Sequence, residues 1–215
     1  MSLRIALPKG ALFEESLSLL ERGGFEVEMM RSDSRKLRFT DEAAGVEYIV
    51  ARPTDIPTYV EYGGVDLGIA GKDVLMESRA QVFELLDLGY GGCRIVVAAP
   101  EGRQAEVRES YLHLGQMRVA TKYPNVTEDF FSQKGIQVEI VKLHGSIELA
   151  PLVGLAEEIV DIASTGRTLA ENNLVVIEEI AACTARLVSN QVSQRLRYDR
   201  IGEFVERIES GLGVG

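Results

Sequence analysis

The amino-acid sequence predicts an α/β fold with mostly parallel sheets flanked by helices. Short apolar runs, typical of buried strands, alternate along the chain with segments whose apolar spacing favours helices, and glycine, proline or hydroxyl residues separate them. This strand–helix–strand repeat is the order that a parallel α/β sheet requires. A glycine-rich segment at residues 89–92 interrupts the repeat, and we expect the chain to enter a second domain there.

The composition is that of a globular protein and argues against two classes of partner. The chain has 215 residues, 46% of them hydrophobic, and a formal net charge of −10. We therefore expect no nucleic acid and no anionic membrane as a partner. Met1 leads straight into an apolar strand, so we expect no signal peptide, and no apolar run approaches the roughly 18 residues of a membrane span. Cys93 and Cys183, far apart in the sequence and without metal-ligand spacing, are typical of a cytoplasmic protein.

The first domain is expected to hold residues 1–91 together with residues 178–215. The segment at residues 12–22 carries leucines on one helical face and ends at two glycines, and Pro57 lies in the first turn of a helix capped by Thr54 or Asp55. Strands are expected at residues 3–7, 45–51, 66–70, 82–88 and 183–188, and helices from about residues 12, 55, 72, 191 and 200. The last helix carries an apolar stripe that indicates core packing or a subunit contact: Ile201, Phe204, Val205 and Ile208.

Three cations occupy equivalent positions in this domain. Lys9, Arg52 and Lys72 each follow a predicted strand and precede a helix. In an open α/β sheet such positions gather at the carboxyl edge, where ligands bind. Together they indicate an anion site, although each alone could be a solvated turn residue. A basic patch lies in the same domain: Arg31, Arg35, Lys36 and Arg38. It fits an anion site or, equally, a solubilising edge strand.

The second domain is expected to hold residues 92–177. Strands are expected at residues 94–99, 117–121, 138–143, 159–162 and 174–177, and helices near residues 126–134, from residue 145 and near residues 169–172. A polar segment at residues 104–115 separates the first two strands.

The stretch from residue 157 to residue 169 carries the clearest chemical signal. An apolar strand runs into Ser-Thr-Gly-Arg-Thr, where backbone N–H groups and hydroxyls converge and Gly166 lets the backbone approach a ligand. A helix start adds partial positive charge, so this turn predicts a phosphate site. Asp161 is expected at the end of the strand, where its carboxylate could take two ribose hydroxyls. The alternative is an ordinary strand–turn–helix whose Ser and Thr cap the helix.

Other kinds of chemistry have no comparable signal. His113 and His144 are not paired with metal ligands, and no nucleophile elbow, Walker motif or dinucleotide fingerprint is present. A structural role is expected for His144 in preference to a place in the cleft. Glu148 begins a helix and could face a ligand or simply favour the helix dipole. The residues therefore indicate a site that holds polyanions without covalent catalysis.

Four segments together resemble the ATP phosphoribosyltransferase family, in the family's order. They are residues 7–10 (Leu-Pro-Lys-Gly), 64–73, 120–125 (Ala-Thr-Lys-Tyr-Pro-Asn) and 148–169. The resemblance covers nearly the whole chain. It implies transfer of the 5-phosphoribosyl group of phosphoribosyl pyrophosphate to N1 of ATP, with Mg²⁺ present and pyrophosphate released. This reaction is the first step of histidine biosynthesis.

The resemblance also implies an architecture and a partner. The family's long form carries a C-terminal regulatory domain of the ACT type, and this sequence ends at Gly215 without one, so it resembles the short form. The implied partner is a regulatory subunit similar to histidyl-tRNA synthetase, in a hetero-oligomer. The implied fold has two lobes, like a type II periplasmic binding protein, with the active site in the cleft between them.

The resemblance and the motifs together assign the site residues. The 5′-phosphate is assigned to the turn after the strand: Ala163, Ser164, Thr165, Gly166 and Thr168. Arg167 of the same turn is also assigned to the binding of phosphoribosyl pyrophosphate. Asp161 is assigned to the ribose hydroxyls and the developing positive charge, with Glu148 as a weaker candidate. Lys9 and Arg52, with Arg31 or Lys72, are assigned to the pyrophosphate and the ATP phosphates. Lys9, Arg52 and Asp161 are the expected catalytic residues. Mg²⁺ is expected to be held mainly by substrate oxygens.

Two alternatives stay open from the sequence. One is a two-lobed module that binds a small ligand without catalysis, and the other is a phosphoribosyltransferase that acts on a nucleobase. The fold cannot separate the first from the enzyme. A phosphate turn with scattered cations favours the enzyme, because an amino-acid sensor needs a single carboxylate clamp.

Overall fold

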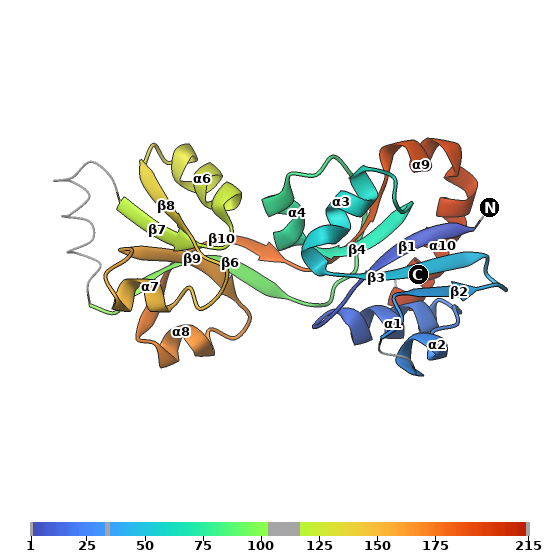
Figure 1. The fold of residues 1–215 in the computed structure, drawn as a ribbon, viewed down its shortest axis with the longest axis horizontal. Coiled ribbons are helices and arrows are strands. Elements are labelled where there is room, and N and C mark those ends of the chain that lie inside the picture. Colours follow the sequence, from blue (N-terminus) through green and yellow to red (C-terminus); the bar gives the residue numbers. More distant parts are fainter. Residues whose placement is uncertain (1, 33–34, 103–116, 214–215) are drawn as a thin grey trace. The chain divides into compact units, whose positions relative to one another are not determined.

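The structure, a computed structural model, describes residues 2–32, 35–102 and 117–213. The chain divides into two compact units: unit 1, Met1–Gly91 with Thr184–Gly215, and unit 2, Gly92–Cys183. Figure 1 shows their elements in sequence colours. The polar segment at residues 104–115, which includes His113, lies outside the described residues.

Unit 1 is built on a six-stranded sheet in the order β2-β3-β1-β4-β11-β5. β1 runs parallel to β3 and β4, whereas β2, β11 and β5 are antiparallel to their neighbours. The strands are β1 (Leu3–Pro8), β2 (Arg38–Asp41), β3 (Val46–Ala51), β4 (Leu67–Gly71), β5 (Phe83–Asp87) and β11 (Ala185–Ser189). Since β3, β1 and β4 are adjacent and parallel, their carboxyl ends share one edge.

Helices cover both faces of this sheet (Figure 1). On one face α1 (Phe13–Arg22), α2 (Glu28–Ser32) and α10 (Tyr198–Leu212) bury apolar side chains in the larger core, and Ile201, Phe204 and Ile208 of the predicted stripe lie in it. On the other face α3 (Ile56–Glu61) and α4 (Lys72–Ser78) close a smaller core. The short helices η1 (Pro53–Asp55) and α9 (Gln191–Leu196) complete the unit.

Gly68 sets how closely α3 lies on β4. A Cβ atom at this position would come within 2.7 Å of the γ-methyl groups of Ile56 and Val60. Protein interiors are packed too densely to absorb such an overlap without a shift. Glycine is therefore the residue that lets the helix sit directly on the strand.

Unit 2 has a five-stranded sheet in the order β10-β6-β9-β7-β8. β7 runs parallel to β8 and β9, and β6 is antiparallel to both β9 and β10. Its strands are β6 (Cys93–Pro100), β7 (Met117–Thr121), β8 (Val138–Lys142), β9 (Glu158–Ala163) and β10 (Leu174–Cys183). Its described helices are α6 (Pro124–Gln133), α7 (Leu149–Leu152) and α8 (Arg167–Glu171). α7 and α8 contribute Ala150 and Leu169 to the core beneath β9.

The structure corrects three details of the sequence prediction. The sheets are mixed, because parallel pairing is confined to β1 and β7 with their neighbours. β10 continues to Cys183, past the predicted end at residue 177, because two irregularities near Glu178 and Ala181 break its side-chain alternation. Asp55 precedes α3, but its side chain makes no capping hydrogen bond. None of the described helices is both long and apolar enough to cross a membrane.

A half-buried carboxyl group gives unit 2 a pH-dependent stability. Burial, together with the charges of Glu157 and Glu178, raises the pKa of Glu158 from 4.5 to about 7. The unfolded chain therefore releases this proton at a lower pH than the folded chain, so stability falls as pH rises from about 4.5 to about 7.

We expect Glu158→Gln to remove this effect. The variant should gain about 2–3 kcal/mol over the wild type in the free energy of unfolding at pH 8, and little at pH 4.5. Urea unfolding at the two pH values measures the difference. Glu139→Gln, an exposed change on β8, is the control. Equal gains for Glu158→Gln at both pH values would contradict the account.

Candidate active site

The predicted phosphate turn lines a pocket in unit 2. The pocket has a volume of about 390 Å³ and lies at the carboxyl end of β9, where the chain turns into α8. Its lining contains every residue predicted for phosphoribosyl pyrophosphate and three further residues, Lys122, Ile162 and Leu169. The full lining is Lys122, Glu148, Asp161, Ile162, Ala163, Ser164, Thr165, Gly166, Arg167, Thr168 and Leu169. The turn and the two carboxylates therefore belong to one site.

The turn presents backbone donors that the protein does not use. Within the described chain, the N–H groups of Ser164, Thr165 and Gly166 donate to no protein acceptor. Gly166 has a φ of +75°, a left-handed conformation that glycine adopts without strain. A Cβ atom there would meet nothing within 4 Å, so the backbone conformation is what requires glycine. Since α8 has only five residues, these amides and the nearby hydroxyls matter more than a helix dipole.

Asp161 forms an ion pair inside this pocket. Lys122 Nζ lies 3.1 Å from Asp161 Oδ1, and the side chain of Asp161 is 17% exposed. The same oxygen accepts a 2.7 Å hydrogen bond from the N–H of Ile162. The carboxylate is thus held at the strand end with its second oxygen, Oδ2, outside these contacts.

Lys122 is the one charged residue of the pocket lining that was not among the predicted site residues. It directly follows β7, which is parallel to β9 and adjacent to it. The rule that singled out Lys9, Arg52 and Lys72, a cation directly after a strand, would have found it. That Lys122 lies next to Asp161 could not be predicted from the sequence, because it depends on the order of the strands in the sheet.

The remaining pocket residues differ in what they offer a ligand. Glu148 precedes α7 without a capping hydrogen bond. Arg167 is 83% exposed on its side chain and forms a 2.7 Å ion pair with Glu171. His144, expected as a structural histidine, is exposed and is not part of the pocket lining.

The three strand-end cations of unit 1 lie where the sequence predicts them. Pro8 of β1 pairs with Ala51 of β3, and the N–H of Lys9 donates to the carbonyl of Ala51, so Lys9 and Arg52 follow neighbouring strand ends. Both side chains are exposed. Lys72 follows β4 on the other side of β1 but is engaged in an ion pair with Glu84.

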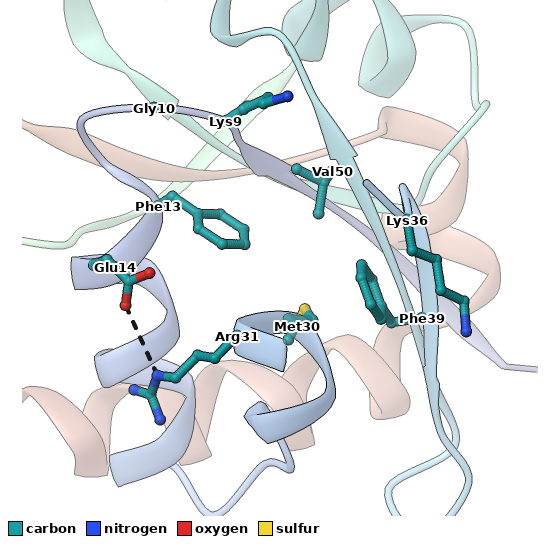
Figure 2. A pocket seen from close by; sticks show the side chains of 9 residues that line it. All are labelled: Lys9, Gly10, Phe13, Glu14, Met30, Arg31, Lys36, Phe39 and Val50. Atoms are coloured by element: carbon teal, nitrogen blue, oxygen red, sulfur yellow. Dashed lines mark ion pairs between the residues drawn. The ribbon is translucent and has the colours of Figure 1, made fainter. Parts of the chain in front are cut away.

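A second pocket, of about 290 Å³, brings Lys9 together with Arg31. Figure 2 shows Phe13 between the two cations, with Phe39 and Val50 on the opposite wall. The Lys36 ammonium lies 5.4 Å from the centre of the Phe39 ring. Arg38 of the basic patch lies on the edge strand β2 and pairs with Glu47 of β3, in keeping with the edge-strand alternative for that residue.

Arg31 is held by carboxylates. Its guanidinium is 3.0 Å from Glu21 and 3.8 Å from both Glu14 and Glu28. The hydrogen bond from Arg31, with its charge, lowers the pKa of Glu21. An anionic ligand at Arg31 must therefore compete with these glutamates, as the dashed contact in Figure 2 illustrates.

The donor set bears on how a metal ion could be held. Among the residues that the structure describes, no group of three or more His, Cys, Asp or Glu side chains is arranged to hold one. Asp161 and Glu148 are the two carboxylates of the unit 2 pocket. This set suits an ion that brings most of its oxygen ligands with its substrate.

Comparison with known proteins shows the family of the chain. The family model described as "ATP phosphoribosyltransferase" matches residues 52–210. The ATP phosphoribosyltransferase of Moorella thermoacetica is 54% identical over 99% of this chain and 94% of its own, and that of Desulfitobacterium hafniense is 52% identical over 98% and 96%.

Solved structures agree in fold as well. The chain of the ATP phosphoribosyl transferase (HisG:HisZ) complex from Thermotoga maritima superposes with a TM-score of 0.84 at 36% identity, over 99% of this chain and 100% of that one. A periplasmic sulfonate-binding protein, SsuA of Methylobacillus flagellatus, superposes with a TM-score of 0.63 at 14% identity, over 98% and 68%, and shares the fold alone. On the extent of these matches, the chain belongs to the ATP phosphoribosyltransferase family.

Proposed function

We propose that the unit 2 pocket binds the ribose 5-phosphate part of phosphoribosyl pyrophosphate and is the donor site of the reaction. The observation that carries this proposal is the turn with three unused backbone N–H groups, in one pocket with Asp161. A phosphate needs several convergent donors, and Ser164, Thr165 and Thr168 add hydroxyls beside the amides. Ala163, Gly166 and Arg167 complete the turn.

As a member of this family, the chain transfers the 5-phosphoribosyl group to N1 of ATP and releases pyrophosphate, the first step of histidine biosynthesis. N1 of neutral adenine already carries a lone pair, so the reaction needs no strong base. It needs two anions held in line and a stabilised leaving group. We assign Asp161 to the ribose hydroxyls and to the positive charge that develops on the sugar, with Glu148 in support.

The cations are assigned to the phosphates. Lys9 and Arg52 are exposed at neighbouring strand ends, so we assign them to the pyrophosphate and the ATP phosphates. Arg31 reaches the same pocket as Lys9 but is held by glutamates, and Lys72 must leave Glu84 to bind a phosphate. We assign Lys122 to neutralising Asp161 while the donor is absent and to a donor phosphate when it binds.

The family uses a metal ion with phosphoribosyl pyrophosphate, and we propose that this ion is Mg²⁺. When bound, Mg²⁺ neutralises diphosphate charge and keeps most of its ligands from water and phosphate. The two pocket carboxylates fit such a substrate-carried ion.

A regulatory partner is supported by the complex in which the Thermotoga maritima relative was solved. We propose that the partner of this chain resembles histidyl-tRNA synthetase and forms a hetero-oligomer with it. Both substrates are intracellular phosphate esters, so we place the enzyme in the cytoplasm. The alternative of a binding module without catalysis rests only on the fold that the chain shares with SsuA, at 14% identity.

An absorbance assay tests this function. The purified chain is mixed with ATP, phosphoribosyl pyrophosphate and Mg²⁺, with and without the partner subunit, and formation of the N1 adduct is followed. Adenine in place of ATP serves as the competing acceptor. Adduct with ATP and none with adenine is the expected result, and the reverse preference would favour a nucleobase enzyme.

Arg52→Ala is expected to lower turnover more than it raises the Michaelis constant for phosphoribosyl pyrophosphate. Charge-assisted hydrogen bonds contribute about 1.5–3 kcal/mol, which corresponds to roughly 10- to 100-fold in kcat. Steady-state kinetics measure the two constants, and Arg195→Ala, an exposed change on α9, is the control. An unchanged turnover with only a raised Michaelis constant would exclude a role on the leaving group.

A further inference from the structure

The two cysteines of the chain, distant in sequence, lie opposite each other in the sheet of unit 2. Cys93 begins β6, Cys183 ends β10, and the antiparallel register pairs them directly. Side chains of directly paired residues project from the same face of a sheet. Both cysteines are thiols in the structure.

Their backbone separation suits a covalent bond. Directly opposed residues in an antiparallel pair have Cα atoms about 4.5–5.5 Å apart, and disulfides span about 4.4–6.8 Å between Cα atoms. The Cβ atoms of opposed residues are about 4.5–5.5 Å apart, and those of a disulfide about 3.5–4.5 Å. The two Cβ atoms therefore have to approach by about 1 Å to reach the disulfide range. The pair stands at the end of its ladder, and Gly92 just before Cys93 meets nothing within 4 Å at its Cβ position, so the strand end can adjust.

The pair also marks both places where the chain passes between the units. Unit 1 ends at Gly91 and resumes at Thr184, so Cys93 is the second residue of unit 2 and Cys183 is its last. On the unit 1 side, Thr184 donates a 2.6 Å hydrogen bond to Asp87. A bond between the cysteines would therefore tie the two connections together.

The two thiols differ in access. Cys93 is partly exposed, whereas Cys183 is 2% exposed. A small reagent can reach Cys93 first, and Cys183 can then attack the adduct from its position across the strand pair. This order, an accessible thiol beside a resolving thiol, is the arrangement of reversible dithiol sites.

We propose that Cys93 and Cys183 form a reversible oxidative modification site, at which a small disulfide converts the two thiols into an intramolecular disulfide. The Cys93 thiolate attacks the reagent's sulfur–sulfur bond and releases one small thiol. The Cys183 thiolate then attacks the Cys93 sulfur and releases the second. Each protein thiol gives up one proton, the protein loses two electrons, and the reagent gains them.

The disulfide restrains the enzyme through the two connections. The substrate contacts proposed above are divided between the units, with Lys9 and Arg52 in unit 1 and Asp161 in unit 2. Tying the connections limits how freely the units move during turnover, so oxidation lowers kcat reversibly. This effect on turnover rests on the proposed function, whereas formation of the bond does not.

Oxidised glutathione is the probe for the test. The full chain, alone and with its partner subunit, is treated with the reagent, and peptide mapping under non-reducing conditions identifies the products. A Cys93–Cys183 peptide is expected, with a thermal midpoint higher by roughly 10 °C because the closed loop is long. Dithiothreitol should reverse both. Cys93→Ser and Cys183→Ala are the controls, and each should yield at most a glutathione adduct on the remaining cysteine.

Stable glutathione adducts on both cysteines, or a bond between two chains, would overturn the site. If the bond forms and turnover stays constant, the site stands and the restraint on the units is wrong. If the untreated wild type shows no phosphoribosyl transfer to ATP, the proposed function is wrong, whatever happens at the cysteines. The two proposals therefore fail by different observations.

Discussion

Replacing Asp161 with alanine should remove about 2–4 kcal/mol of transition-state stabilisation and so lower kcat/KM by roughly 30- to 1,000-fold. The carboxylate is held at the end of β9 by Lys122 and by the N–H of Ile162, so it is preorganised where the sugar is proposed to develop positive charge. A group that is oriented before the reaction costs no reorganisation in the transition state. Steady-state kinetics with ATP and phosphoribosyl pyrophosphate measure the loss.

Two further variants make this result specific. Asp161→Asn keeps the shape and removes the charge, so it should lose most of the activity that Asp161→Ala loses. Glu139→Ala, an exposed carboxylate on β8 of the same sheet, should remain close to wild type. Near-wild-type turnover in both Asp161 variants would remove this residue from the mechanism.

Replacing Asp66 with alanine should lower the free energy of unfolding by about 3–5 kcal/mol. Asp66 is 2% exposed and accepts hydrogen bonds from the N–H of Arg4 (2.8 Å), the hydroxyl of Ser193 (2.7 Å) and the guanidinium of Arg197 (2.9 Å). It thus joins β1 to the C-terminal helices. Removing the carboxylate leaves these donors without their shared acceptor, which costs more than a surface pair would.

Thermal or urea unfolding measures this effect on unit 1. Glu203→Ala is the matched control, because it breaks the exposed pair with Arg200, and such pairs contribute about 0–1 kcal/mol. A loss for Asp66→Ala no larger than that of the control would show that the network contributes little.

Most strands and helices could be predicted from the sequence because each depends on a pattern of apolar residues within one short segment. The strands from Leu3 and from Val46 are mostly apolar, each with a single charged residue, and α1 has its leucines on one face and ends at glycine. The short helix α2 gave no such signal, since five residues are too few for a helical pattern to repeat. β10 was cut short in the prediction because its irregular pairing interrupts the alternation that marks a strand.

The residues of the candidate site could be predicted where they lie on one continuous segment of the chain. Asp161 and the turn that ends at Thr168 come from consecutive residues, so their convergence in one pocket follows from a strand that turns into a helix. The residues brought in from elsewhere were harder to foresee. Lys122 reaches Asp161 only because β7 lies beside β9.

Pairings between distant residues could not be predicted at all. The glutamates around Arg31, the pairing of Lys72 with Glu84 and the opposition of Cys93 and Cys183 each depend on how elements pack. Composition and spacing carry no information on such contacts. These contacts also decide which cations a phosphate can engage without first breaking an ion pair.

Titration of the isotopically labelled chain with ribose 5-phosphate, followed through its backbone amide resonances, tests the central claim most directly. Since the N–H groups of Ser164, Thr165 and Gly166 are proposed to grip the sugar phosphate, their resonances should shift most, and the shifts should saturate. Saturating shifts confined to the residues around Lys9 and Arg31, with the turn unaffected, would contradict the account.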